Sequence, residues 1–441
     1  MSLLVQSAFP VLPTRHSRSL SSWLGNLNSL GPPSSNMSAS ELPFQRWFKF
    51  KEAFSPSLIV ECLKHLDYRV NTCLDPFGGC GTTGVTCQFL GIAPTLIEVN
   101  PFIADLAESK LAVYDRHSLL DDFQAVVRKA KKMSIADNSV LWKYLPLTFV
   151  EPGVQGRYLY MRSTMRRILA YREAIEALQN STNLRLLKVL LGSILVTASN
   201  AVVNGKGRKY RGGWLLKQKR PEDIDQLFSQ SFSQAVEDVE RYTHRAQHRY
   251  KVLRGSCLGK AMSVSSADVA IFSPPYPNSF DYTDIYNIEL WVLGYLRSPK
   301  DNQLLRTSTL RSHVQCSFTD DETLCESKLL LRTFKKLQKV RSDLWDPRIP
   351  EMILGYFSDL TKLLRQLRSS VRGGGSVFVV VGDSRYKDVS VRVSDILVEL
   401  SQLMGFRIQS AKVIREMRTS AQQGGLPLLR ETVLHLKNQK H

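Results

Sequence analysis

One short segment constrains the fold of this 441-residue chain more than any other, the glycine-rich turn "DPFGGCGTT" at residues 75–83. An apolar strand precedes the turn, a helical pattern follows it, and a second strand, "TLIEVN", ends near Glu98. Strand, turn, helix and strand in roughly thirty residues is the pattern of a βαβ unit. Since parallel strands are joined by such crossovers, the segment predicts an α/β fold with helices on both faces of the sheet.

The glycine turn also predicts a ligand. Its glycines allow a ligand close to the backbone, and we expect Thr82 or Thr83 to cap the following helix, whose free N–H groups would face a pocket. Glu98 follows Gly81 by seventeen residues and could accept hydrogen bonds from both hydroxyls of a ribose. Nicotinamide and flavin folds use similar turns, and such a carboxylate could instead cap a helix or form an ion pair. The combination favours an adenosine-like ligand at the carboxyl edge of the sheet.

A second turn, Ser273-Pro274-Pro275-Tyr276, follows the apolar strand "DVAIF". Two prolines fix the backbone and remove N–H donors, so the carbonyls and the Ser273 hydroxyl are left as oriented acceptors. Two acceptors that hold the protons of an exocyclic amine aim its lone pair at an electrophile, and Tyr276 offers a flat face on which a base could stack. Pro-Pro-Tyr is also a common loop string and a ligand of small aromatic modules. Its position after a strand of the same sheet favours catalysis on a base amine.

Together these motifs resemble the amino-group DNA methyltransferases that use S-adenosylmethionine. "DPFGGCGTT" is similar to their cofactor motif and "SPPY" to their catalytic motif, in the order of the alpha type, and the resemblance covers most of residues 45–437. It implies a Rossmann-like sheet and direct in-line methyl transfer without a covalent intermediate. Serine at the first catalytic position more often accompanies N4-cytosine than N6-adenine methylation. The resemblance implies these cofactor-binding residues: Phe54, Ser55, Asp75, Phe77, Gly79, Gly81, Thr82, Glu98 and Ser256. Ser256 stands where many relatives have Asp, so its contact departs from the pattern.

The order of patterns along the chain predicts four regions. Residues 1–40, with eleven Ser, four Pro and no Lys, Asp or Glu, indicate a disordered tail, which could be a transit peptide or lie upstream of a true start at Met37. Residues 41–115 begin the catalytic domain, and residues 251–441 complete it with further strands. Between them, residues 116–250 carry helical periodicity, with one helix entered at Pro221, and form an inserted region for target recognition.

Charge indicates a polyanionic partner. Lys plus Arg number 59 against 40 Asp plus Glu, a net charge of +19. The segment 205–220 has seven basic residues, no acidic one, and two interleaved aromatic residues. Its glycines predict a mobile loop that contacts duplex DNA, although a solvated basic loop is the alternative. The residues expected to contact DNA are Lys206, Arg208, Lys209 and Arg211.

The remaining features exclude other classes. The seven cysteines are odd in number and lack the paired spacing of a zinc site, so we expect reduced thiols and no metal. No apolar run long enough to span a bilayer is evident, and we expect a cytoplasmic, bacterial-type enzyme, possible organellar targeting aside. A restriction endonuclease or other phage-defence partner would fit. An RNA base-amine methyltransferase and a non-catalytic nucleic-acid-binding scaffold are the rival hypotheses.

Overall fold

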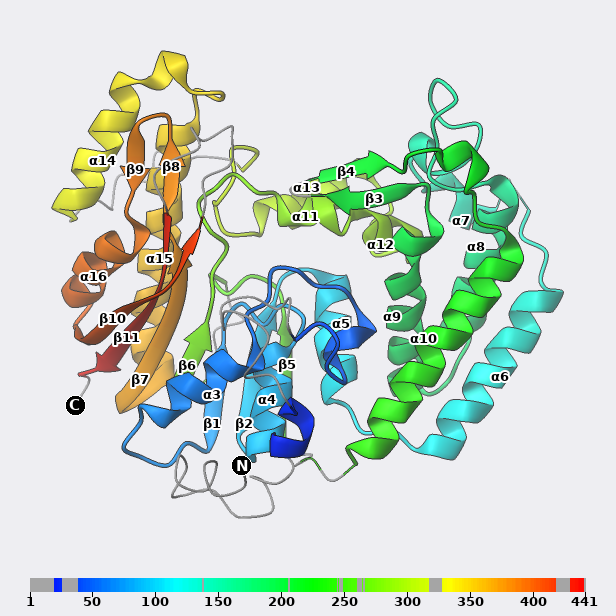
Figure 1. Ribbon diagram of the computed structural model, residues 1–441, viewed down its shortest axis with the longest axis horizontal. Coiled ribbons are helices and arrows are strands. Elements are labelled where there is room, and N and C mark those ends of the chain that lie inside the picture. The colour runs from blue at the N-terminus through cyan, green and yellow to red at the C-terminus, as the bar shows by residue number, and fades with distance from the viewer. Residues whose placement is uncertain are drawn as a thin grey trace.

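The fold is seen in a computed structural model of the chain (Figure 1). The structure describes residues 20–25, 39–136, 139–204, 207–243, 245, 249–259, 264, 266–316, 327–417 and 429–439. Its helices are α3 Pro56–Lys64, α4 Thr82–Leu90, α5 Pro101–Leu111, α6 Arg116–Lys132, α7 Val140–Lys143, α8 Arg162–Glu176, α9 Ser181–Ala198, α10 Pro221–Arg241, α11 Tyr282–Ile285, α12 Asn287–Val292, α13 Pro299–Thr307, α14 Lys328–Lys339, α15 Ile349–Ser370 and α16 Val393–Leu403. Its strands are β1 Thr72–Asp75, β2 Ala93–Glu98, β3 Ala201–Asn204, β4 Gly207–Tyr210, β5 Lys251–Arg254, β6 Ala267–Phe272, β7 Val371–Gly382, β8 Ser384–Tyr386, β9 Val389–Val391, β10 Phe406–Met417 and β11 Leu429–Asn438.

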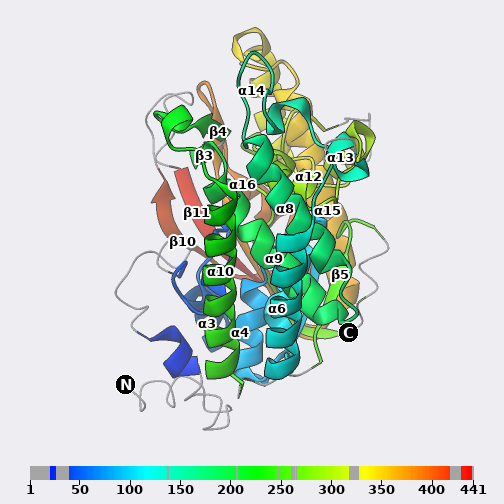
Figure 2. The same cartoon turned by 90° about the vertical axis from the view of Figure 1, so that its right-hand side faces the viewer.

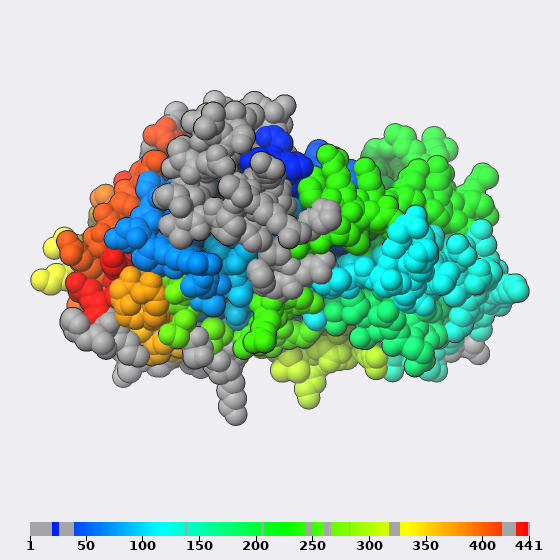
Figure 3. Space-filling view, turned by 90° about the horizontal axis from the view of Figure 1, so that it is seen from below, coloured from blue at the N-terminus to red at the C-terminus, as the bar shows by residue number. Residues whose placement is uncertain are grey.

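A seven-stranded sheet organises the catalytic part, in the order β10-β11-β7-β6-β1-β2-β5. The pairs from β7 to β5 are parallel, whereas β11 pairs antiparallel with both β7 and β10. Two apolar clusters cover it, one containing residues of α3, α4 and α5 and the other residues of α15 and α16. The predicted Rossmann-like α/β fold is therefore confirmed. In the view from below, early blue segments and late orange ones lie side by side, because strands from both ends of the chain complete one sheet (Figure 3).

The strand order places a ligand site between β1 and β6. From β1 the chain builds outward through β2 to β5, and it then returns to add β6 on the other side of β1. The loops that follow β1 and β6 therefore diverge at the carboxyl edge and leave a crevice between them, which is where open α/β sheets bind ligands. Both predicted motifs, residues 75–83 and 273–276, occupy these two loops.

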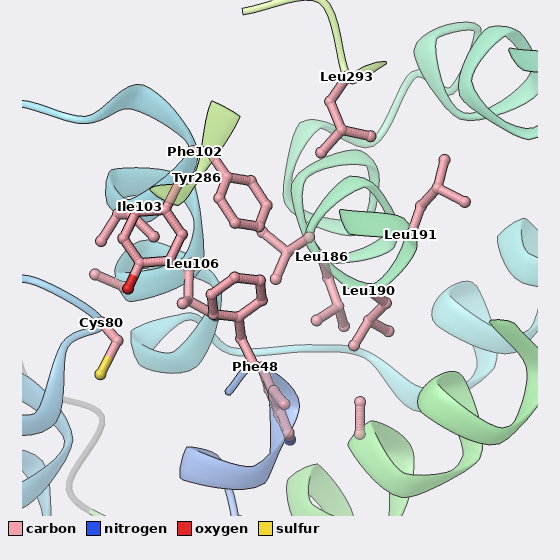
Figure 4. Close-up of a cluster of buried hydrophobic side chains, with 14 of the residues drawn as sticks. Phe48, Cys80, Phe102, Ile103, Leu106, Leu186, Leu190, Leu191, Tyr286 and Leu293 are labelled. Atoms are coloured by element: carbon pink, nitrogen blue, oxygen red, sulfur yellow. The ribbon is translucent and has the colours of Figure 1, made fainter. Parts of the chain in front are cut away.

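A helical body lies beside the sheet, formed mainly by α6, α8, α9 and α10 (Figure 2). Its central helix α9 packs against α5, α8 and α10. A Cβ added at Gly192 would lie 2.5 Å from the Phe102 ring, so α9 can approach α5 this closely only with glycine at that position. Phe48, Phe102, Leu186 and Leu190 meet at this junction (Figure 4), and one apolar cluster runs from the sheet into the helical body.

Helix α9 is also the one helix among the described residues that is long and apolar enough to cross a membrane, judged by length and composition. Its contacts identify it as a core helix, since 56% of that window is buried inside the protein. Residues such as Leu187, Leu191 and Leu195 are fully buried along it.

Part of the predicted disordered tail is ordered, which corrects the prediction for residues 20–25. Leu20 and Trp23 are buried, and the indole of Trp23 stacks on Phe89 with 4.4 Å between ring centroids. The indole N–H donates to the carbonyl of Pro43 at 3.0 Å. The prediction rested on the average composition of residues 1–40 and therefore did not detect Trp23, whose ring packs on Phe89 of α4. The rest of residues 1–38 lies outside the described residues.

Candidate active site

A cavity of about 480 Å³ lies at the carboxyl edge of the sheet, where the loops after β1 and β6 diverge. Most of the predicted site residues line it: Phe54, Asp75, Phe77, Gly79, Thr82, Glu98, Ser256, Ser273, Pro274, Pro275 and Tyr276. Ser55 and Gly81 are not in its wall. The two motifs, almost 200 residues apart in sequence, therefore form opposite parts of one cavity.

The glycine turn is fixed by its own backbone. Gly79 and Gly81 have φ angles of 48° and 82°, in the left-handed region that favours glycine. Gly81 packs against helix α5, because a Cβ there would lie 3.0 Å from Ala107 Cα. Gly81 thus supports the turn from behind while Gly79 faces the cavity.

The predicted threonine cap of α4 is wrong. Gly81 is the N-cap residue of α4, and it has no side chain with which to cap the helix. The Thr82 hydroxyl donates to Gln45 Oε1 at 3.3 Å, and the Thr83 hydroxyl donates to Asp75 Oδ2 at 2.6 Å. Since the threonines begin the helix itself, their hydroxyls serve neighbouring polar groups, and the first N–H groups of α4 have no side-chain cap.

Two carboxyl groups, those of buried Asp75 and partly buried Glu98, hold the turn in shape. Asp75 accepts from the Phe77 amide at 2.9 Å and from Thr83, and Glu98 accepts from the amides of Gly79 and Asn100 at 2.9 and 2.8 Å. Burial raises the pKa of each to about 7. Each oxygen of Glu98 holds one amide and has a further lone pair for a ligand hydroxyl.

The segment before α3 closes another side of the cavity. Phe54 lines the cavity, while the Ser55 hydroxyl caps α3 by accepting from the Ser57 amide at 3.3 Å. Glu52 accepts a hydrogen bond from the Tyr286 hydroxyl at 2.5 Å, and burial raises the pKa of Glu52. Sequence reasoning missed Glu52 and Tyr286, because they belong to segments without a motif and meet only in the fold.

The Ser-Pro-Pro-Tyr turn begins directly after β6, which ends at Phe272. The Tyr276 hydroxyl donates to Glu431 Oε1 on β11 at 2.6 Å. The Tyr386 hydroxyl on β8 donates to the Pro277 carbonyl at 2.8 Å, which ties the turn to the β8–β9 hairpin. Sequence reasoning also missed Glu431, although its place in the apolar strand "ETVLHLK", on the same face as Val433, was a usable signal.

The cysteines have no catalytic geometry. The six described cysteines are free and buried, and Cys325 lies outside the described residues. Burial raises the pKa of Cys62 to about 12 and of Cys316 to about 11, which disfavours the thiolate. No group of metal-binding side chains occurs among the residues that the structure describes.

Part of the predicted mobile basic loop at residues 205–220 is regular structure, because β4 (Gly207–Tyr210) pairs antiparallel with β3 in a β-hairpin. Arg211 fixes its end by donating to the carbonyls of Ser199, Val196 and Thr197. Arg208 donates to the Asp284 carbonyl at 3.2 Å, Lys209 is exposed, and Lys206 lies outside the described residues. Gly207 is the first residue of β4, whereas Gly212 and Gly213 lie in the turn before the 3-10 helix Trp214–Leu216.

The aromatic residues of that segment contact protein. Tyr210 and Trp214 lie 5.3 Å apart between ring centroids, and Trp214 packs edge-on against Tyr158. These two rings therefore pack on each other, and Trp214 packs on Tyr158 as well.

The chain is similar to known methyltransferases. It is 26% identical to the type II methyltransferase M.AvaI of Nostoc sp. over 87% of this chain and 83% of that protein. It is 21% identical to the type II methyltransferase M.BsoBI of Geobacillus stearothermophilus over 86% of this chain and 82% of that protein. No protein-family model matches the sequence.

Among solved structures, the rRNA methyltransferase AviRa from Streptomyces viridochromogenes aligns with 88% of this chain and 86% of its own, at 11% identity. The TM-score is 0.31. The Rossmann-like fold is evident from the strand order of the sheet itself. The similarity to type II methyltransferases over most of the chain, on a Rossmann-like sheet, supports a methyltransferase with S-adenosylmethionine as its methyl donor.

Proposed function

We propose that this protein transfers a methyl group from S-adenosylmethionine to the exocyclic N4 amine of cytosine in duplex DNA. The observation that carries the proposal is the shared cavity: the Ser273–Tyr276 turn and the glycine turn with Glu98 line the same space. A nucleotide-type cofactor and an extruded base could therefore meet there. Type II methyltransferases as relatives make DNA the first substrate to test.

The cavity has the donor and acceptor groups that such a cofactor requires. Glu98 would accept from the ribose hydroxyls, Phe77 and Gly79 would face the nucleoside, and Phe54 would lie near the methionine part. Ser256 lines the cavity where the adenine is expected, and Asp75 and Thr82 line it at the two ends of the glycine turn. When bound, the cofactor supplies a methyl group on a positively charged sulfur, which makes that carbon electrophilic.

The protein's own part is to hold the amine. The Ser273 hydroxyl and the carbonyls of the proline pair are acceptors for its protons, and Tyr276 would stack on the base. Holding the amine in this way aims its lone pair at the methyl carbon and excludes water. No residue of the turn is a nucleophile, so the reaction needs no covalent enzyme intermediate.

The basic hairpin would contact the DNA backbone. Lys209 is exposed on β4 and Arg208 belongs to the same strand, and Lys206, which lies outside the described residues, stays a predicted contact. Phosphate contacts of this kind position a duplex without reading its sequence. We place the activity in the bacterial cytoplasm, with a restriction endonuclease or another phage-defence protein as an expected companion.

The decisive experiment is to express the protein in a host free of DNA methylation and sequence the modified bases. N4-methylcytosine at one short motif supports the proposal, whereas N6-methyladenine at such a motif would correct the target base. If RNA is labelled and no DNA is methylated, the substrate is RNA and not DNA. If the protein binds the cofactor but methylates no substrate, the result would favour a non-catalytic nucleic-acid-binding scaffold.

Variants then test the site. Ser273→Ala and Tyr276→Ala should abolish methyl transfer while the dissociation constant for S-adenosylmethionine stays unchanged. Tyr144→Ala is the matched control, because Tyr144 is 40% exposed and remote from the cavity wall. Undiminished transfer in both cavity variants would refute the assignment of the turn.

A further inference from the structure

Glu431 is a buried residue whose two carboxylate oxygens differ in their hydrogen bonds. It belongs to β11, where it pairs with Gly382 of β7, and β6, β7 and β11 lie in adjacent or next-adjacent positions of the sheet (Figure 1). Its side chain lines the cavity and the residue is only 4% exposed. Oε1 accepts from the Tyr276 hydroxyl at 2.6 Å, but buried Oε2 has no hydrogen-bond donor among the described residues.

The other carboxylates of the cavity differ from Glu431. Four acidic side chains line it, Glu52, Asp75, Glu98 and Glu431, and only Glu431 has a buried oxygen without a donor among the described residues. Asp75 and Glu98 accept one donor on each oxygen, as described above. A buried acceptor left unpaired destabilises the folded protein, and more so when it is charged. Such a group in a folded protein calls for an explanation, and a ligand that supplies the donor is one.

No described cation neutralises this oxygen. Arg415 lies directly opposite Glu431 on β10 and also lines the cavity, yet the two side chains form no ion pair within 4.0 Å. Arg430, the neighbour of Glu431 along β11, pairs instead with Asp383 at 3.2 Å. Glu431 Oε2 therefore remains available to whatever enters the cavity beside Tyr276.

The proposed reaction needs such a group. Methyl transfer forms a bond from the amine nitrogen to carbon and breaks the carbon–sulfur bond, whose electron pair goes to sulfur. The methylated nitrogen then carries a positive charge and one proton too many. The Ser-Pro-Pro-Tyr turn offers hydroxyls and carbonyls but no carboxylate, so it has no strong acceptor for that proton.

On the basis of the proposed function, we infer that Glu431 Oε2 accepts a hydrogen bond from the exocyclic amine of the target base and then takes its surplus proton. One amine proton is held by Glu431 and the other by an acceptor of the turn. The proton leaves Glu431 for solvent through the cavity, which restores the carboxylate. The same contact selects for an amine, since a keto oxygen at this position would face a carboxylate oxygen with no proton between them.

The test compares Glu431→Gln with wild type on a synthetic duplex that carries the site mapped by sequencing. The amide can still accept from Tyr276, but it cannot take a proton and presents an N–H to the base. We expect the single-turnover rate to fall about 100-fold or more, within the range for general-base groups, with the S-adenosylmethionine dissociation constant unchanged. Glu431→Ala should lose the rate as well.

A second readout separates contact with the base from a structural role. Wild type should bind the duplex with the target amino base more tightly than the same duplex with its keto analogue, uracil for cytosine or hypoxanthine for adenine. In Glu431→Gln this preference should disappear or reverse. Thr432→Val is the matched control, because Thr432 is the next residue of the same strand, is buried, and is absent from the cavity wall.

The outcomes are distinct. If wild type methylates the duplex and Glu431→Gln keeps both its rate and its amino-over-keto preference, the inference about Glu431 is overturned while the proposed function stands. A slower Glu431→Gln with an unchanged preference would also overturn it, in favour of a purely structural role. If wild type methylates no base amine in DNA, the proposed function itself fails.

Discussion

The two halves of the cavity differ in whether their carboxylate oxygens already accept hydrogen bonds from the protein. On the side of the glycine turn, every carboxylate oxygen of Asp75 and Glu98 accepts a hydrogen bond, from a backbone amide or from the Thr83 hydroxyl. On the side of the Ser-Pro-Pro-Tyr turn, Glu431 has one oxygen bonded by Tyr276 and one oxygen without a described donor.

The difference is the one that the two ligands of the proposed function would require. A cofactor of constant structure is suited to a rigid turn whose polar groups are already oriented, because little ordering remains to be done on binding. An extruded base brings the N–H donors of its own amine. An acceptor that receives its hydrogen bond only from that amine favours a base that carries one. We therefore expect damage to the first half to appear in cofactor affinity and folding, and damage to the second half to appear in rate and base choice.

The largest effect should come from Glu98→Ala. The substitution removes the ribose acceptor and leaves the amides of Gly79 and Asn100 without their acceptor. Hydrogen bonds to charged groups contribute about 1.5–3 kcal/mol each, so the dissociation constant for S-adenosylmethionine should rise at least about 100-fold. Titration calorimetry measures it, with the half-exposed surface residue Glu61→Ala as control; an unchanged constant would show that the ribose lies elsewhere.

Thr83→Val should destabilise the protein by about 1–3 kcal/mol, because it removes the only donor to buried Asp75 Oδ2 among the described residues. Urea unfolding of the ligand-free protein measures the loss. Thr86→Val is the matched control, since the Thr86 hydroxyl donates to the Thr82 carbonyl of its own helix and that carbonyl retains its helical bond. Equal losses in the two variants would contradict the importance of the Asp75 bond.

Protonation should affect the two properties of the glycine-turn half in opposite directions. Burial raises the pKa of Asp75 and Glu98 to about 7 from ordinary values of 3.8 and 4.5. Because the folded state binds these protons more tightly, their contribution to stability is full below pH ~4 and is lost as the pH rises through 7. Cofactor affinity, which uses ionised Glu98, should instead increase up to about tenfold per pH unit below 7 and level off above it. Calorimetry and unfolding at pH 5.5, 6.5 and 8 test both trends, and parallel trends would contradict this explanation.

Tyr276→Phe should affect only the base half. It keeps the aromatic face but removes the donor to Glu431 Oε1. A net hydrogen bond contributes about 0.5–1.5 kcal/mol, so the methyl-transfer rate should fall about two- to tenfold with cofactor affinity unchanged. A change in cofactor affinity would show that the two halves are not separable.

The smallest effect should come from the hairpin. Lys209→Gln should reduce the slope of log affinity for duplex DNA against log salt by about 1 without changing the cofactor constant. Arg211→Gln should mainly lower stability, because Arg211 holds three carbonyls at the end of α9. An unchanged slope for Lys209→Gln would mean that DNA contacts another surface.

The sequence was sufficient for the features that local pattern determines. The glycine turn required a strand before it and a helix after it, and Pro221 marked the start of α10 as predicted. Strand "DVAIF" pairs beside β1, so both motif loops had to reach one edge of the sheet. The Rossmann-like fold followed from those few segments.

Features that depend on long-range contacts escaped prediction. Glu431 meets Tyr276 across 155 positions of sequence, and Tyr286 meets Glu52 across 234. Trp23 is buried only because α4 leaves an aromatic surface open to it. Threonine capping failed for the reverse reason, since a glycine with positive φ already occupied the N-cap position.

If the protein acts on duplex DNA as proposed, the close contact of α9 with α5 at Gly192 limits how it can engage that DNA. Because one apolar core joins the helical body to the sheet, we expect the protein to bind the duplex with a preformed surface and without a hinge closure of two domains. The target base must then travel the whole way into the cavity. Unstacking it requires a few kcal/mol, and that free energy has to come from contacts with the flanking phosphates and bases. The affinity of the protein for duplex DNA should thus be greatest when the target base is mispaired, because such a base is already less well stacked.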